Sequence, residues 1–148
     1  MDISYKFNNN VVYSCKYHIV WCPKYRKKIL FGSIEKRLKQ VVREICKETN
    51  SELIEIECDG DHVHMLVEVD PQFGINKFVK LAKGRSSNIL RKEFPEIKSK
   101  LPTLWTNSYF VSTVGGVTID VVKKYVESQK TRYEDIKSKG WNNNGRKV

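Results

Sequence analysis

Residues 62–69 read His62-Val63-His64-Met65-Leu66-Val67-Glu68-Val69. Successive side chains of a β-strand point to opposite faces of the sheet. The residues at 63, 65, 67 and 69 therefore form one wholly apolar side, whereas His62 and His64 point together to the other. This alternation predicts a strand that lays one face on a core covered by helices and leaves its histidine face open.

The segments on either side of this strand predict the rest of the fold. Gly60, between two aspartates, predicts a tight turn with a positive φ angle. The other expected elements are strands at 11–22, 53–58 and 104–114, and helices at 33–49, 75–94 and 118–133. The order β-α-β-β-α-β predicts an α+β, ferredoxin-like (RRM-like) antiparallel sheet with both helices on one face, followed by an additional C-terminal helix. One domain is expected over 1–133, with a polar C-terminal tail over 134–148.

Composition excludes several classes of protein. The chain has 148 residues, with 40% hydrophobic and 11% aromatic residues, which argues against a disordered or fibrous protein. No apolar run approaches the roughly 20 residues that span a bilayer, and the N-terminus does not resemble a secretory signal. The four cysteines form no C-x-x-C pair, which argues against a zinc knuckle or a disulfide framework. A cytoplasmic, basic protein without membrane association is expected.

The net charge of +10 is unevenly distributed. Residues 24–43 carry eight Lys and Arg with one acid, residues 77–100 carry eight with two acids, and residues 50–70 carry seven acids and no Lys or Arg. This pattern favours a surface for a polyanion next to a site for a cation, although solvated helix faces would also produce it. Cations mixed with a ring suit single-stranded nucleic acid, and the candidates in the first block are Lys24, Tyr25, Arg26, Lys27 and Lys28.

The paired histidines are the first candidate site. Two imidazoles two residues apart on a strand can both bind one divalent ion through neutral nitrogens, and Asp59 and Asp61 just upstream favour a cation nearby. The alternative is that His62 and His64 are merely solvated on an open sheet face. His18, the third histidine, is expected to be a packing or surface residue rather than a ligand.

The last helix carries the second candidate site. Tyr125 and Gln129 are four residues apart and share one helical face. A phenol is a poor nucleophile unless a metal on the scissile phosphate assists it, and Gln129 can give that metal a neutral oxygen ligand. Lys123 and Lys124 are candidates to bind phosphate oxygens. The alternative is an ordinary amphipathic helix with a half-buried tyrosine.

Three motifs together carry a resemblance that covers the chain from about Val12 to Tyr133. They are Trp21-Cys22-Pro23-Lys24-Tyr25-Arg26, Gly60-Asp61-His62-Val63-His64 and Tyr125-Val126-Glu127-Ser128-Gln129. The chain resembles the TnpA-like single-tyrosine HUH transposases of single-strand insertion sequences, with the REP-associated tyrosine transposases as close relatives. The resemblance implies that Tyr125 is the nucleophile, that His62, His64 and Gln129 are the metal ligands, and that the cofactor is Mg²⁺ or Mn²⁺.

The resemblance also implies a function and partners. A transposase of this family cleaves and rejoins single-stranded DNA at element ends that form hairpins, through a 5′-phosphotyrosine intermediate. The two basic blocks, including Lys83 and Arg85, would bind that DNA. A homodimer is expected, with the tyrosine helix completing the site of its own or the partner subunit, and Gly115-Gly116 permits either arrangement.

Three other functions remain open from the sequence. One is a replication-initiator or relaxase-like nickase, which shares the histidine pair. Another is a non-catalytic binder of structured single-stranded nucleic acid on the same kind of sheet. The last is a small metal-sensing regulator, which would leave the basic blocks unexplained.

Overall fold

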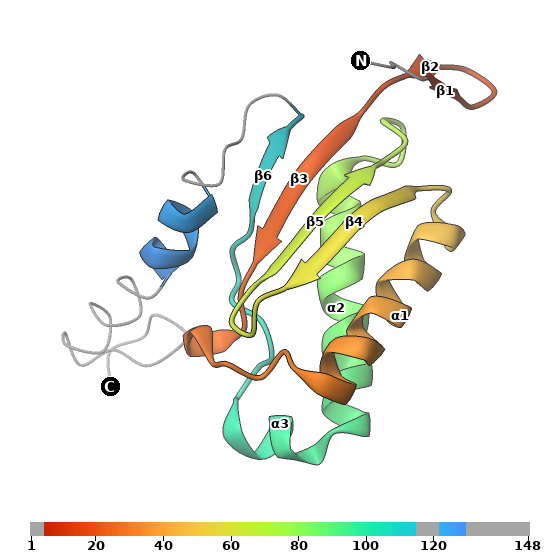
Figure 1. Ribbon diagram of the computed structural model, residues 1–148. Helices are drawn as coiled ribbons and strands as arrows, with labels where there is room; N and C mark the ends of the chain where they lie inside the picture. Colours follow the sequence, from red (N-terminus) through yellow and green to blue (C-terminus); the bar gives the residue numbers. More distant parts are fainter. Residues whose placement is uncertain (1–4, 115–121, 130–148) are drawn as a thin grey trace.

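The computed structural model describes residues 5–114 and 122–129. Its centre is a four-stranded sheet in the order β4-β5-β3-β6, and each neighbouring pair is antiparallel. The bounds of these strands are β3 (Lys16–Trp21), β4 (Glu52–Cys58), β5 (Val63–Glu68) and β6 (Phe110–Thr113). The predicted ferredoxin-like, α+β fold is confirmed (Figure 1).

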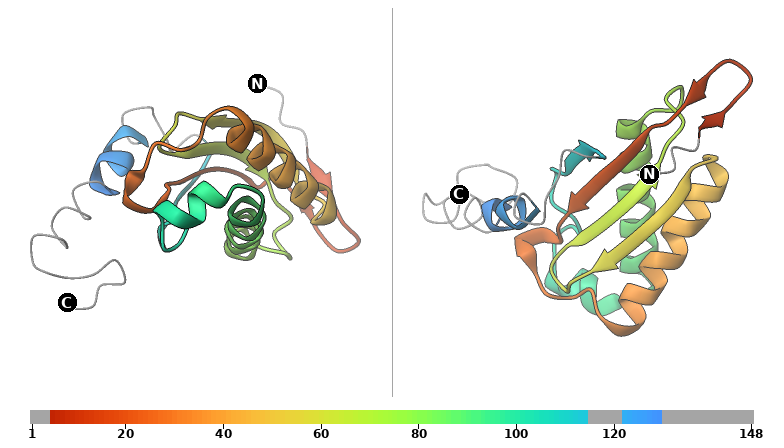
Figure 2. Two further views of the ribbon diagram at one scale, coloured as in Figure 1. Left: turned by 90° about the horizontal axis from the view of Figure 1, so that it is seen from below. Right: turned by 45° about the horizontal axis from the view of Figure 1, so that its top comes forward.

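Two long helices, α1 (Gly32–Glu48) and α2 (Ile75–Glu93), cover one face of this sheet (Figures 1 and 2). The covered face carries the apolar half of the alternation in β3 and β5, because Ile19, Trp21 and Met65 are completely buried in one core cluster with residues of both helices. Leu38 and Phe78, also completely buried, supply the helix side of that core. The apolar face predicted for residues 63–69 is therefore the face that packs.

The turn before β5 has the predicted geometry. Gly60 has a φ angle of 84°, which favours glycine. A Cβ atom at this position would also collide with the ring of Phe31. The backbone carbonyl of Gly60 accepts hydrogen bonds from the amides of Ile29 and Leu30. These contacts fix the turn that carries Asp59, Asp61 and His62.

Several predicted boundaries were wrong. The strand expected at 11–22 is two strands, β2 (Val12–Tyr13) and β3, and β2 pairs with the unexpected β1 (Lys6–Phe7). The segment between the helix expected at 75–94 and the strand expected at 104–114 contains a short helix, α3 (Pro95–Lys100). The strand expected from 104 begins only at Phe110, because the preceding residues leave the sheet to bury Leu104 and pair Trp105 with Pro23.

The C-terminal helix is described over residues 122–129, and the remainder of the predicted 118–133 helix, like Gly115-Gly116 and the tail, lies outside the described residues. This helix lies beside β6, away from α1 and α2 (Figure 1). Within the described part of the chain, no helix is long and apolar enough to cross a membrane.

Candidate active site

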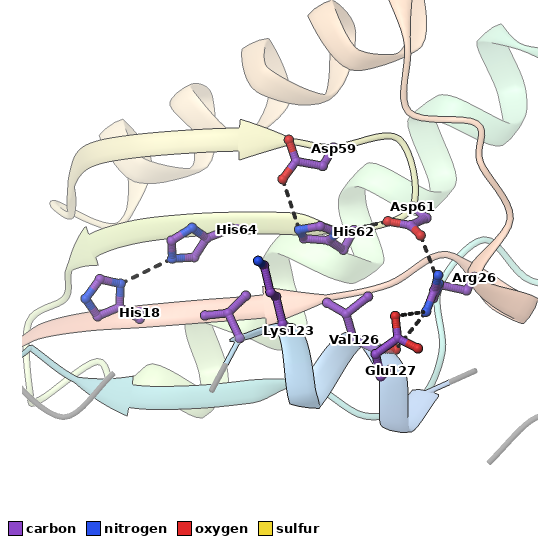
Figure 3. Close-up of a pocket in the computed structure, with 10 residues that line it drawn as sticks. His18, Arg26, Asp59, Asp61, His62, His64, Lys123, Val126 and Glu127 are labelled. Atoms are coloured by element: carbon purple, nitrogen blue, oxygen red, sulfur yellow. Dashed lines mark hydrogen bonds and ion pairs between the residues drawn. The ribbon is translucent and has the colours of Figure 1, made fainter. Parts of the chain in front are cut away.

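A pocket with a volume of about 640 Å³ opens between the histidine face of the sheet and the helix at 122–129. Figure 3 shows the ten residues that line it. They include His18, His62 and His64, which are all the histidines of the chain. The helix contributes Val122, Lys123, Val126 and Glu127, and the remaining residues are Arg26, Asp59 and Asp61.

His18 is placed differently from the sequence-based expectation. Its Nδ1 atom lies 3.2 Å from Nε2 of His64, and the two rings stack with centroids 5.4 Å apart. The contact arises from sheet register: β3 pairs His18 with Leu66 and Val20 with His64, so the two imidazoles are diagonal neighbours on one face. His18 is therefore part of the pocket, and its even-numbered position opposite the apolar set of its strand was the signal that sequence reasoning undervalued.

His64 is kept in the neutral form that binds metals. Burial lowers its pKa from the ordinary value, and the neighbouring His18 adds to this effect. A neutral imidazole has one nitrogen with a free lone pair, which is the form that ligates a cation.

His62 precedes β5 instead of beginning it, and two carboxylates flank its ring. Nδ1 of His62 lies 2.9 Å from Oδ1 of Asp61, and Nε2 lies 3.2 Å from Oδ2 of Asp59. A carboxylate can only accept, so each ring nitrogen that carries a proton donates to its aspartate. In a neutral ring with the proton on Nδ1, the lone pair of Nε2 faces an oxygen of Asp59. Two acceptor atoms that face each other, here Nε2 of His62 and Oδ2 of Asp59, are held together by a proton or a cation between them.

The donor atoms in the pocket fit a divalent cation. Neutral imidazole nitrogens and carboxylate oxygens are ligands that Mn²⁺ accepts, and oxygen atoms suit Mg²⁺. Among the described residues, however, no three His, Cys, Asp or Glu side chains already form a metal-binding group. A cation held by His62 and His64 would need at least one further ligand.

Arg26 connects the pocket to the helix. Its Nε atom lies 2.8 Å from Oδ2 of Asp61, and its Nη1 atom lies 3.4 Å from both the carbonyl oxygen of Val126 and Oε1 of Glu127. Figure 3 shows the resulting chain of contacts from His62 through Asp61 to the helix. Arg26 was predicted as a DNA-binding residue from its charge, and the structure adds these protein contacts.

Tyr125 and Gln129 lie on the flank of the helix next to β6. The hydroxyl of Tyr125 is 3.4 Å from Oγ of Ser108, which donates at 3.0 Å to Oε1 of Gln129. The ring of Tyr125 also packs 5.5 Å from that of Phe110. Neither Tyr125 nor Gln129 is among the described residues that line the histidine pocket. The structure therefore brings the helix at 122–129 close to the histidines. The side chains of Tyr125 and Gln129 lie on the side of this helix that faces Ser108 and Phe110, outside the pocket lining.

The cations predicted to bind DNA occupy different environments. Lys27, Lys28 and Lys124 are exposed, whereas Lys24 is buried and Tyr25 is half-buried. Lys83 donates to the carbonyl oxygens of Thr106 and Ser108, and burial lowers its pKa to about 8. Arg85 forms an ion pair with Glu48 at 2.6 Å. Exposure thus favours Lys27, Lys28 and Lys124, and the DNA contacts of all these residues stay a prediction.

Comparison with known proteins agrees with this fold and these motifs. The family model described as "Transposase IS200 like" matches residues 11–129. The chain is 37% identical over 131 residues to the ISDra2 transposase TnpA of Deinococcus radiodurans, a match that covers 87% of this chain and 94% of that protein. It is 36% identical over 123 residues to the transposase for insertion sequence element IS200 of Salmonella typhimurium, covering 80% and 81% of the two proteins.

Solved structures give the same result. A crystal structure of a Deinococcus radiodurans protein described as a transposase superposes with a TM-score of 0.77 at 35% identity, over 84% of this chain and 97% of that one. A REP-associated tyrosine transposase bound to a REP hairpin superposes with a TM-score of 0.52 at 9% identity, covering 93% and 75% of the two chains, and shares the fold.

The fold, the motifs and these matches define the class: the protein is a transposase, one of the enzymes that cleave DNA. More specifically, the chain belongs to the family of IS200-like transposases. The family resemblance inferred from the three motifs is confirmed.

Proposed function

We propose that this transposase cleaves and rejoins single-stranded DNA at the ends of an insertion sequence, with Tyr125 as the nucleophile. The observation that carries the proposal is the pocket itself, because it joins His62 and His64 to the helix that bears Tyr125. Residues 62–64 and the helix at 122–129 are far apart in the sequence, and only the fold brings them together.

In the proposed reaction, the oxygen of Tyr125 attacks the scissile phosphorus and the bond to the 3′ oxygen breaks. The phenolic proton leaves to solvent, and the DNA 5′ end is joined to Tyr125 as a phosphodiester. The departing 3′ oxygen takes a proton from solvent and becomes a 3′-hydroxyl. Attack of a 3′-hydroxyl on the phosphotyrosine then reverses the step. The number of phosphodiester bonds is unchanged, so no external energy source is needed.

The chain's own residues would hold the cofactor and the substrate. His62 and His64 would bind Mg²⁺ or Mn²⁺. Gln129 would be a third ligand once its Oε1 atom no longer accepts the hydrogen bond from Ser108. When bound, the ion withdraws charge from the phosphate and so makes it a better target for a phenol. Lys123, exposed at the pocket, can neutralise a phosphate oxygen of the strand that enters.

Tyr125 must leave Ser108 and Phe110 to reach a phosphate near the histidines, either of its own subunit or of a second copy. A homodimer that exchanges these helices would satisfy this requirement. The proposed partner is single-stranded DNA with hairpins at the element ends, and the hairpin-bound REP-associated transposase of the same fold supports a structured DNA ligand.

A covalent-adduct assay tests the proposal. The wild-type protein, with Mn²⁺ and a single-stranded element end, should yield a protein–DNA adduct that survives SDS. Tyr125→Phe should bind the DNA equally well and form no adduct, because only the attacking oxygen is lost. An adduct in Tyr125→Phe would refute the assignment and direct attention to Tyr133.

The same assay separates the other functions. A non-catalytic binder predicts DNA binding without metal and without any adduct, unchanged when His62 and His64 are replaced by alanine. A nickase predicts an adduct that a free 3′-hydroxyl does not resolve into joined strands.

A further inference from the structure

The turn that carries Arg26 is strained. Tyr25 and Arg26 have φ angles of 60° and 51°, two consecutive non-glycine residues in the left-handed region. Such strain persists only when the surroundings impose it, and it is concentrated at functional sites. Here the turn is held by the hydrogen bond from the amide of Lys24 to the carbonyl of Leu104, at 2.8 Å. The strained backbone directs the side chain of Arg26 into the pocket.

The guanidinium of Arg26 uses separate nitrogen atoms for separate elements. Nε binds Asp61 on the turn before β5, and Nη1 binds the helix through Val126 and Glu127. The side chain of Arg26 is 15% exposed and that of Asp61 is 10% exposed, whereas that of Glu127 is 70% exposed. The ion pair with Asp61 is less exposed to solvent and is therefore the stronger contact. The bonds to the helix are weaker and break more easily.

Asp61 also uses its two oxygens for two partners. Oδ2 accepts from Arg26, and Oδ1 accepts from Nδ1 of His62. When Nδ1 donates to Asp61, the lone pair left for a cation is that of Nε2, which lies 3.2 Å from Oδ2 of Asp59. The carboxylate of Asp61 thus links the guanidinium of Arg26 directly to the imidazole of His62.

We propose that Arg26 is a positioning residue that couples the docking of the 122–129 helix to the orientation of His62. This inference rests on the proposed function and adds a means of control to it. His62 is oriented to bind the metal when the helix that bears Tyr125 is docked. A lysine cannot replace Arg26, because one ammonium lacks the planar fork that reaches both partners.

The test measures Mn²⁺ alone binding to the full chain, by titration calorimetry or by the EPR signal of free Mn²⁺. Arg26→Gln should weaken Mn²⁺ binding by about tenfold or more, the usual effect of removing a residue that orients a metal ligand. Arg26→Gly should weaken it equally while relieving the positive φ angle, so a folding defect cannot explain the result. In Arg26→Gly, millimolar guanidinium should restore part of the affinity.

A matched control is available in Arg37. It forms an Nε–carboxylate ion pair at 2.8 Å with Glu93, away from the pocket. Arg37→Gln removes the same charge and the same kind of contact, so it should leave Mn²⁺ affinity unchanged. If Arg26→Gln also leaves it unchanged, or if both variants weaken it equally, the proposal is overturned.

The coupling has its own readout in amide hydrogen exchange of residues 122–129. Asp61→Asn should accelerate exchange of this helix several-fold, because the bonds described here join Asp61 to the helix through Arg26. Unchanged exchange in Asp61→Asn would overturn the coupling. A wild-type chain that binds Mn²⁺ at the histidines but never forms a DNA adduct would overturn the proposed function alone, because Mn²⁺ affinity and amide exchange are both measured without DNA.

Discussion

The two faces of the central sheet come from the same strands and have opposite characters. On the covered face, Ile19 and Met65 are fully buried against α1 and α2. On the other face, their immediate neighbours His18 and His64 are half-buried and line the pocket. Because strand parity alone separates the two sets, one strand supplies both the core and the candidate site. The difference implies that stability and chemistry can be altered independently.

Replacing a pocket histidine should produce the largest effect. We expect His64→Ala to reduce adduct formation by roughly 10³-fold or more, which corresponds to about 4 kcal/mol in the barrier. The free energy of unfolding should change by no more than about 1 kcal/mol, because the side chain is half-buried and outside the apolar core. Adduct kinetics and urea denaturation measure the two quantities. Unfolding of His64→Ala would show that the two faces are not separable. Retained activity would show that His64 does not take part in cleavage.

Replacing a core residue should have the reverse effect. Phe78 is completely buried on α2, so Phe78→Ala should lower the free energy of unfolding by about 3–5 kcal/mol. Mn²⁺ affinity measured well below the melting temperature should be retained. Phe7→Ala is the control, because residue Phe7 is 73% exposed and loss of its side chain should cost less than about 0.5 kcal/mol. Equal costs in Phe78→Ala and Phe7→Ala would contradict the assignment of the core.

A smaller effect is expected at Lys83, which joins the covered side to the segment that carries Ser108. Its pKa is lowered from 10.5 to about 8 by burial. Between these values the unfolded chain keeps the proton and the folded chain loses it, so the contribution of Lys83 to stability rises with pH. The stability advantage of the wild type over Lys83→Met should therefore grow from pH 8 to pH 10 in urea denaturation.

The control for this measurement is Lys80→Met, which removes an exposed lysine from the same helix. A wild-type advantage over Lys83→Met that stays constant or shrinks with rising pH would mean that the amine of Lys83 is not buried as the structure places it.

The periodic parts of the fold could be predicted from the sequence because their patterns are local. The alternation at 63–69 and the apolar stripe at 34–45 identify β5 and α1, and Gly60 identifies the turn between β4 and β5. Segments whose position depends on distant partners were not predictable. Trp105 lies outside the sheet, where its indole N–H donates a hydrogen bond to Oγ of Ser86 on α2. No local sequence pattern indicates this contact.

The candidate site was likewise only partly predictable. The pairing of His62 with His64, and the aspartates beside them, could be predicted from one short stretch of the sequence. His18 lies next to His64 because of the register of β3 against β5, which the sequence does not reveal. The sequence indicates only a surface cation at Arg26, whereas the structure places its Nε atom 2.8 Å from Oδ2 of Asp61. The bond between Tyr125 and Ser108 also depends on tertiary contacts, so sequence spacing could not indicate where the phenol lies.

We propose that the histidine face of the sheet binds a divalent cation that takes part in DNA cleavage. Histidine-selective NMR tests this directly, because all three imidazoles of the chain line the one pocket. Substoichiometric Mn²⁺ should broaden the signals of His18, His62 and His64 together, and His64→Ala should abolish the broadening of the other two. If Mn²⁺ leaves all three signals sharp at concentrations that support adduct formation, the metal acts elsewhere and the account is contradicted.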